Sequence, residues 1–130
     1  MSDITTVILA AGNSTRFKAS KSKLVYPLCG LPIVSHIFNI AKKISGKNIL
    51  IVSNEKNKEE LKLILNTSKL VVQKKQKGTA DAIEQVKKYV KSKNILILFG
   101  DTPLVEVKDI RKLVSKFKKS KSKASLIAFN

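Results

Sequence analysis

The sequence predicts an α/β fold: a Rossmann-like, three-layer α/β/α domain with a mostly parallel sheet. Apolar runs rich in β-branched residues recur along the chain, and segments with the apolar spacing of helices separate them. The runs are apolar throughout rather than alternating, so both faces of each strand are expected to be buried, as in parallel sheets covered by helices. Ligands of such sheets bind beyond the carboxyl ends of the strands.

The individual elements follow from these patterns. Pro32 suits the first turn of a helix that Gly46 ends, and the lysine-rich stretch 116–123 is expected to be a solvated helix end and connection. The other helices are expected after Asn57, over Thr79–Tyr89 and over Asp109–Phe117. The expected strands are Thr5–Leu9, Asn48–Val52, Leu70–Val72, Asn94–Phe99 and Ala124–Phe129.

Length and composition indicate one domain with an aliphatic core. The chain has 130 residues, of which 43% are hydrophobic and only 5% aromatic, with no Trp. Cys29 is the only cysteine, so no intramolecular disulfide can form and a reducing compartment is expected. The N-terminus lacks the cations of a secretory signal, and no apolar run approaches the ~18 residues of a membrane span. We therefore expect a cytoplasmic protein without a membrane partner.

The net charge of +17 would attract a polyanion such as nucleic acid, an anionic membrane or a nucleoside triphosphate. Arg16 and Arg111 are the only arginines, whereas specific readers of bases and phosphates rely on the planar arginine fork. The scarcity of arginine and of aromatic stacking platforms argues against nucleic acid as the partner. A coding bias on a solvated surface also explains the lysine excess and is the simpler explanation, and a functional basic face stays open as the alternative.

Small residues follow the first expected strand, in the order Leu9-Ala10-Ala11-Gly12-Asn13-Ser14-Thr15-Arg16. Such side chains let the backbone approach a planar or phosphate group closely, and an arginine adds a charged fork. Neither the dinucleotide-binding glycine pattern nor the Walker pattern is present. From the residues alone, a phosphate cradle and a tight turn at the strand exit are both open.

The fourth expected strand ends in Phe99-Gly100-Asp101-Thr102-Pro103-Leu104. A carboxylate at this edge of the sheet is well placed to hold Mg²⁺, which prefers one or two carboxylates together with phosphate oxygens. A Gly-Asp pair followed by proline is also a common turn. Metal binding at Asp101 is therefore one of two interpretations of this segment.

Taken together, these segments resemble a known family. "LAAGNSTR", Lys23 seven positions after Arg16, "PLCGLPIVSHI", "QKKQKGTADAI" and "ILFGDTPL" are similar to the N-terminal part of the bacterial bifunctional N-acetylglucosamine-1-phosphate uridyltransferases. These enzymes belong to the nucleotide-diphospho-sugar transferase fold, within the MobA-like NTP transferase superfamily. The resemblance runs nearly from end to end. "KLVYPLCGLPI" also resembles the molybdenum-cofactor cytidylyltransferases, but their Arg-to-Lys spacing is typically shorter and "GTADAI" fits them less well.

The resemblance implies a role for each matching residue. Arg16 and Lys23 match the catalytic cations on the phosphates of the nucleotide, and Asp101 matches a magnesium ligand. Gln73, Gly78 and Thr79 match the residues that recognise uracil. The complete implied nucleotide-binding set is Leu9, Ala10, Ala11, Gly12, Lys23, Gln73, Gln76, Gly78, Thr79, Phe99, Gly100 and Asp101.

The implied reaction makes UDP-N-acetylglucosamine, a peptidoglycan precursor, from UTP and a sugar 1-phosphate. An oxygen of the sugar phosphate attacks the α-phosphorus of UTP, so the substrate brings the nucleophile. Catalysis then consists of alignment and charge neutralisation by Mg²⁺, Arg16 and Lys23.

This sequence departs from the family pattern in residue identity and in length. Ser14, Ser22, Asp81 and Phe99 stand where glycine, proline, histidine and tyrosine are common. Residues 1–130 match only the nucleotide-binding half of the domain, so the sugar-binding half and the acetyltransferase domain are expected to be absent, and turnover by this chain is in doubt. The alternatives are a catalytically silent nucleotide-binding remnant, a split-enzyme subunit completed by a second polypeptide, and a basic nucleic-acid-binding protein.

Overall fold

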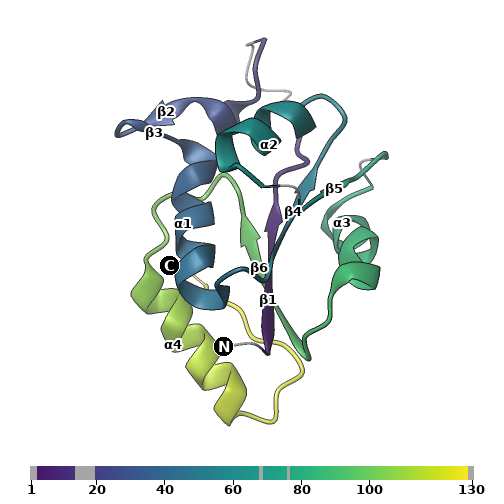
Figure 1. Ribbon diagram of the computed structural model, residues 1–130. Coiled ribbons are helices and arrows are strands. Elements are labelled where there is room, and N and C mark those ends of the chain that lie inside the picture. Colours follow the sequence, from purple (N-terminus) through teal and green to yellow (C-terminus); the bar gives the residue numbers. More distant parts are fainter. Residues whose placement is uncertain (1–2, 14–19, 68, 76, 129–130) are drawn as a thin grey trace.

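The computed structural model describes residues 3–13, 20–67, 69–75 and 77–128 and has one main sheet (Figure 1). Its four strands lie in the order β5-β4-β1-β6, and every neighbouring pair is parallel. The predicted parallel sheet is therefore confirmed. The strands are β1 (Ile4–Leu9), β4 (Ile49–Ser53), β5 (Leu70–Val72) and β6 (Asn94–Phe99).

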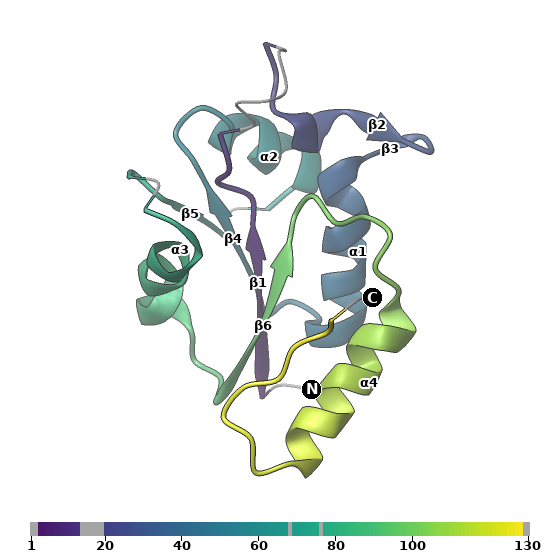
Figure 2. The ribbon, with the colours of Figure 1, turned by 180° about the vertical axis from the view of Figure 1, so that it is seen from behind.

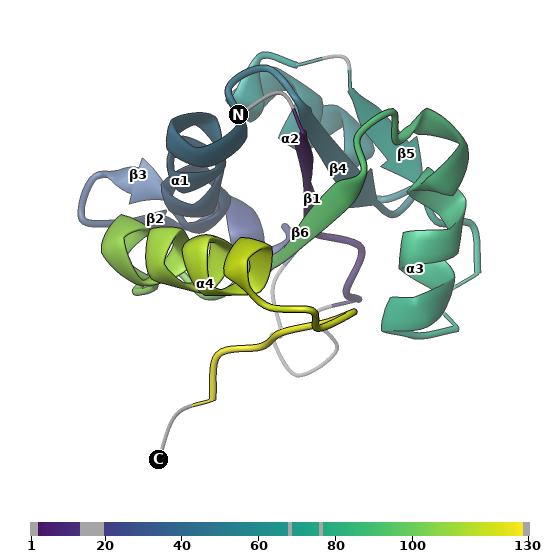
Figure 3. The same cartoon turned by 90° about the horizontal axis from the view of Figure 1, so that it is seen from below.

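Helices lie on both sides of this sheet, as Figure 3 shows from below. Side chains that alternate along β1 point to opposite faces: Ile8 packs in the core cluster with α1, α2 and α4, whereas Val7 packs in a smaller cluster with α3. The three-layer α/β/α arrangement predicted from the sequence is thus confirmed. The helices are α1 (Ile33–Ser45), α2 (Lys58–Leu65), α3 (Thr79–Val86) and α4 (Val107–Lys119).

The helix ends follow the expected signals. Pro32 directly precedes α1, and Gly46 ends it with a φ of 60°, which a residue with a side chain rarely adopts. The predicted helix over Thr79–Tyr89 consists of α3 followed by a 3₁₀ turn, η2 (Lys87–Tyr89). None of the described helices is long and apolar enough to cross a membrane.

A short hairpin between β1 and α1 was not predicted. Strands β2 (Pro27–Leu28) and β3 (Leu31–Pro32) pair antiparallel through Cys29 and Gly30, whose φ values of 50° and 81° are those of a type I′ turn. His36 of α1 holds this hairpin, because its Nε2 lies 2.8 Å from the carbonyl oxygen of Leu28. His36 therefore has a structural contact.

The fifth strand expected over Ala124–Phe129 is wrong for residues 124–128, which form no strand. The segment runs beside β6 and α4 in Figure 2. Ile127 packs against the larger core cluster, while Leu126 is 80% exposed. Of the apolar residues in this segment only Ile127 packs on the core, and the others are exposed. The prediction failed because an apolar run alone does not specify a hydrogen-bonding neighbour.

Candidate functional site

The strand ends lie in register along one edge of the sheet. Leu9 is opposite both Val52 and Phe99, and Ser53 is opposite Val72. The residues that follow these strands continue the hydrogen bonding across the edge: the amides of Ala10, Gly100 and Gln73 donate to the carbonyls of Val52, Leu9 and Ser53 at 2.8, 2.9 and 2.8 Å. The loops singled out in the sequence therefore converge at the carboxyl edge, where ligands of parallel sheets bind.

Two asparagines hold the Ala-Ala-Gly segment after β1. Asn54 Nδ2 donates to the carbonyl oxygens of Ala11 and Gly12 at 3.1 and 3.4 Å, and Asn57 Nδ2 donates to that of Ala10 at 2.8 Å. Both asparagines are buried, as are Ala10 and Ala11, whereas Gly12 is exposed. The segment is thus supported from beneath and presents Gly12 at the surface.

Sequence reasoning missed this pair. Asn54 and Asn57 also bind each other's backbone, with the Asn54 amide donating to Asn57 Oδ1 at 3.0 Å and the Asn57 amide to Asn54 Oδ1 at 2.9 Å. Asparagine side chains commonly make such local bonds in turns. The available signal was two asparagines three positions apart directly after a buried strand, in "SNEKN".

The two glycines of the predicted nucleotide set have different structural reasons. A Cβ on Gly100 would lie 3.1 Å from the carbonyl oxygen of Leu9, which is tighter than nine in ten real contacts of this kind, so a side chain there would require the Leu9 backbone to shift. A Cβ on Gly12 would meet no atom of the described residues within 4 Å, and Gly12 does not have a positive φ. Neither packing nor conformation within the described chain requires glycine at position 12.

Lys23 and Asp101 form an ion pair, with Lys23 Nζ 2.6 Å from Asp101 Oδ2. Lys23 begins a 3₁₀ turn, η1 (Lys23–Val25), which Ser22 caps by accepting a 3.4 Å hydrogen bond from the Leu24 amide. Leu24 is buried, and its Cδ2 would be 3.6 Å from a Cβ on Gly100. Packing of Leu24 beside Gly100 therefore brings the neighbouring Lys23 to the neighbouring Asp101.

The surroundings of Asp101 fit a magnesium ion that is bound mainly through phosphate. No group of three or more His, Cys, Asp or Glu side chains able to hold a metal occurs in the described ranges. A single carboxylate combined with phosphate oxygens and water is a usual Mg²⁺ arrangement. The Asp101 side chain is 42% exposed and thus accessible from solvent, and Lys23, 39% exposed, supplies a cation beside it.

Gln73 and Gly78 also meet at this edge, at the end of β5. Gln73 is buried, and its Nε2 donates to the Gly78 carbonyl at 3.2 Å and to Asp81 Oδ2 at 2.6 Å. Gly78 directly precedes α3 with a φ of 101°, where a side chain would be strained. Thr79, the first residue of α3, is exposed.

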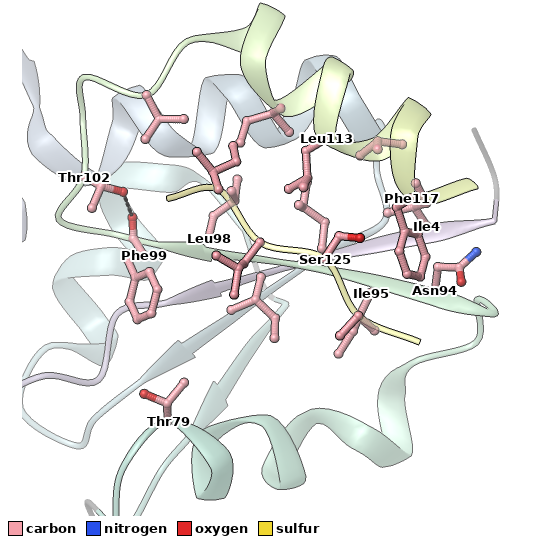
Figure 4. Close-up of a pocket in the computed structure, with 18 of the residues that line it drawn as sticks. Ile4, Thr79, Asn94, Ile95, Leu98, Phe99, Thr102, Leu113, Phe117 and Ser125 are labelled. Atoms are coloured by element: carbon pink, nitrogen blue, oxygen red, sulfur yellow. Dashed lines mark hydrogen bonds between the residues drawn. The ribbon is translucent and has the colours of Figure 1, made fainter. Parts of the chain in front are cut away.

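Thr79 and Phe99 lie at one end of a pocket of about 620 Å³ (Figure 4). The pocket is lined by β6, by α4 and by the segment 123–127. Phe99 is 48% exposed, and Ile95 and Ile97 on the same strand are also exposed. Because α3 packs with β1 and β4, this side of β6 remains an open apolar surface.

Arg16 and Gln76 lie outside the described residues, so their roles stay predictions. The remaining predicted residues lie at the same edge in three groups. Residues 9–12 are at the end of β1, and the two outer groups are Gln73, Gly78 and Thr79 beyond β5 and Lys23, Phe99, Gly100 and Asp101 at the end of β6. Three strand spacings of about 4.8 Å separate these outer strands, or roughly 14 Å in total. A ligand that contacts both outer groups must extend across the edge, over the Ala-Ala-Gly segment of the central strand β1.

Comparison with known proteins gives the family. Residues 6–130 match the MobA-like NTP transferase domain. The bifunctional protein GlmU of Buchnera aphidicola subsp. Schizaphis graminum is 42% identical to this chain over 120 residues, which are 91% of the chain and 26% of that protein. The chain thus spans about a quarter of the length of this relative, and the resemblance to its N-terminal part is confirmed.

Solved structures agree on the fold. Rv0371c from Mycobacterium tuberculosis H37Rv superimposes with a TM-score of 0.76 at 19% identity, covering 91% of this chain and 62% of that one. A CMP:2-keto-3-deoxy-manno-octonic acid synthetase complexed with CTP gives 0.72 at 18% identity, covering 91% and 48%. With the parallel sheet, its helical layers and the match over residues 6–130, the chain belongs to the family of MobA-like NTP transferase domains.

Proposed function

We propose that this chain is the nucleotide-binding half of a uridylyltransferase, which uses UTP and N-acetylglucosamine 1-phosphate. The observation that carries the proposal is the register of the strand ends. It gathers Ala10, Gln73 and Gly100 at one edge of the sheet, together with the loops that carry the other residues matched to the nucleotide. The resemblance of the motifs to the N-acetylglucosamine-1-phosphate uridyltransferases suggests uridine as the base and the amino sugar as the acceptor, and the 42% identity to the bifunctional protein GlmU supports membership of a nucleotidyltransferase family.

Each part of the edge has a distinct task in this proposal. The exposed backbone of Gly12 lets the nucleotide approach β1 closely, and Gln73 and Gly78 contact the base. Arg16 and Lys23 neutralise the phosphates. Since Asn54 and Asn57 hold three carbonyls of the segment from below, the backbone under the nucleotide is ordered before the ligand arrives, which lowers the entropic cost of binding.

The reaction needs no nucleophile from the protein. An oxygen of the sugar 1-phosphate forms a bond to the α-phosphorus of UTP, the bond from that phosphorus to the bridging oxygen of the β-phosphate breaks, and pyrophosphate leaves. Asp101 would hold the Mg²⁺, which supplies charge neutralisation to the phosphate oxygens. The chain's own contributions are to align the nucleotide and to place the Lys23 ammonium beside the developing charge.

We further propose that residues 1–130 bind the nucleotide but require the rest of the domain for turnover. The apolar side of β6, with Ile95, Ile97 and Phe99 exposed, is a surface that a soluble domain normally covers. The solved relatives extend beyond the matched region. The covering segment would come from a continuation of the chain or from a second polypeptide. In either case we expect the protein to act in the cytoplasm.

Calorimetric titration with UTP and Mg²⁺ tests the proposal, with CTP as the competing nucleotide and Asp101→Ala as the variant. We expect UTP to bind more tightly than CTP, the variant to weaken binding, and pyrophosphate exchange to be absent without the rest of the domain. Absence of UTP binding at millimolar nucleotide would reject the proposal. Binding with full turnover by residues 1–130 would reject only the statement that the chain is incomplete.

A further inference from the structure

The side chain of Gln73 has a defined orientation. Within the described part of the chain, both of its hydrogen bonds are donated by Nε2, to the Gly78 carbonyl at 3.2 Å and to Asp81 Oδ2 at 2.6 Å. A carbonyl and a carboxylate only accept hydrogen bonds. The amide nitrogen must therefore face these two oxygens. The oxygen and nitrogen of a glutamine amide are similar in shape, and here the two acceptor oxygens decide which atom lies where.

This orientation determines what Gln73 presents to a ligand. With Nε2 held by two acceptors, Oε1 is the side-chain atom left to meet a ligand, and it can only accept a hydrogen bond. The final torsion of a glutamine side chain has a broad, roughly two-fold preference, so it does not by itself select one orientation. The 2.6 Å bond to the Asp81 carboxylate is charge-assisted and shorter than the bond to Gly78. Asp81 is therefore the main constraint on Gln73.

We propose that Asp81 is a positioning residue that makes Gln73 an acceptor for a ring N–H and thereby selects uracil over cytosine. This inference rests on the proposed function, in which Gln73 contacts the base. Uracil carries a hydrogen on N3 and donates to Oε1, whereas N3 of neutral cytosine is itself an acceptor and would face another lone pair. A site built around a specific hydrogen bond discriminates strongly against a base that cannot make it.

The contact between Asp81 and Gln73 joins α3 to the residue that directly follows β5. The buried position of Gln73 adds to its effect, because an amide shielded from water cannot exchange its partners freely. Replacing Asp81 by asparagine keeps the shape of the side chain but offers either an oxygen or an NH₂ group. Gln73 could then turn over and present Nε2 to N3 of cytosine, losing only its longer, 3.2 Å bond to the Gly78 carbonyl.

The test measures the dissociation constants of Mg²⁺-UTP and Mg²⁺-CTP for the wild-type chain, Asp81→Asn and Glu84→Gln. Glu84 also lies in α3, where it forms an exposed 3.4 Å ion pair with Lys87, and its replacement changes the net charge by the same amount. We expect the wild type and Glu84→Gln to prefer UTP by at least about tenfold. Asp81→Asn should lose most of this preference, chiefly by binding CTP more tightly.

A double-mutant cycle separates positioning from a general effect on the fold. In a Gln73→Ala background, Asp81→Asn should leave the UTP to CTP ratio unchanged, because the residue through which Asp81 acts is gone. Urea unfolding midpoints of all variants show whether the changes in ratio arise with the fold intact.

The possible outcomes separate the two proposals. If the wild type prefers UTP and Asp81→Asn retains the full preference, the role of Asp81 is rejected while the proposed function stands. Equal binding of UTP and CTP by the wild type also rejects the role of Asp81, because there is then no preference for Asp81 to produce. If the wild type binds no UTP, the proposed function fails, and the inference about Asp81 fails with it.

Discussion

Lys23 and Asp101 are 78 residues apart in the sequence, yet Lys23 Nζ lies 2.6 Å from Asp101 Oδ2. The pair links the loop that follows β1 to the end of β6. Both side chains are more than a third exposed, so solvent screens the attraction and its contribution to stability is small. The contact is therefore more informative about the site than about the fold, because it places a cation beside the proposed magnesium ligand.

Lys23→Ala is expected to weaken Mg²⁺-UTP binding by about tenfold or more while changing the free energy of unfolding by less than about 1 kcal/mol. The lost ammonium no longer neutralises phosphate, but an exposed ion pair stabilises little. Calorimetry and urea unfolding measure the two effects. Lys108→Ala is a matched control, since Lys108 forms an exposed 2.9 Å pair with Glu106. Unchanged affinity in Lys23→Ala would contradict the role of Lys23.

Asn57→Ala should lower the free energy of unfolding by about 1–3 kcal/mol, because it leaves the carbonyl of the buried Ala10 without the 2.8 Å bond from Asn57. The same change should weaken nucleotide binding, since the segment under the ligand loses part of its support. Lys56→Ala, with an exposed side chain in the same loop, serves as the control for both readouts. A stability equal to that of the control would show that water replaces the asparagine without cost.

Gly12→Ala and Gly100→Ala are expected to behave in opposite ways. At position 12 the new methyl group would meet no atom of the described residues within 4 Å, so stability should stay within about 0.5 kcal/mol of the wild type. Nucleotide affinity should fall because the methyl group occupies the approach to the backbone. At position 100 the methyl group would lie 3.1 Å from the Leu9 carbonyl oxygen, and we expect a loss of about 1–3 kcal/mol. Unfolding curves and titrations of both variants check this. A stable Gly12→Ala variant with wild-type affinity would place the nucleotide elsewhere.

Asp3 should contribute stability that depends on pH. The hydrogen bond from Lys118, with Nζ 3.0 Å from the carboxylate, holds the pKa of Asp3 below its ordinary value of 3.8. A carboxylate with a lowered folded pKa stabilises the fold fully above its unfolded pKa and loses this effect as the pH falls through the folded value. The difference in unfolding free energy between wild type and Asp3→Asn should therefore be present at neutral pH and shrink in acid. If the difference in unfolding free energy does not vary with pH, the effect of Asp3→Asn does not come from the ion pair with Lys118.

The apolar patterns of the sequence determined the local elements and the class of fold. The runs that became β1 and β4 are buried on both faces, as the unbroken apolar pattern predicts. The same expectation is wrong for β6, where Ile95, Ile97 and Phe99 leave one face exposed, because the pattern does not show which strand lies at the edge of the sheet. Glycine at positions 46 and 78 has the positive φ that only glycine adopts easily, so these helix boundaries are also local properties. The motifs that indicated a nucleotide site lie in the loops after these strands, where the parallel register gathers them.

The tertiary structure alone decided which distant side chains meet. Asn54 and Asn57 reach the backbone after β1, and Asp81 binds Gln73, because the pairing of β4 with β1 and β5 brings these loops together. The segment 124–128 is apolar like a strand but packs beside β6 and α4 without joining the sheet. Composition and periodicity record how apolar a segment is. Hydrogen-bond partners depend on chain topology and on the packing of whole elements, which no local pattern specifies.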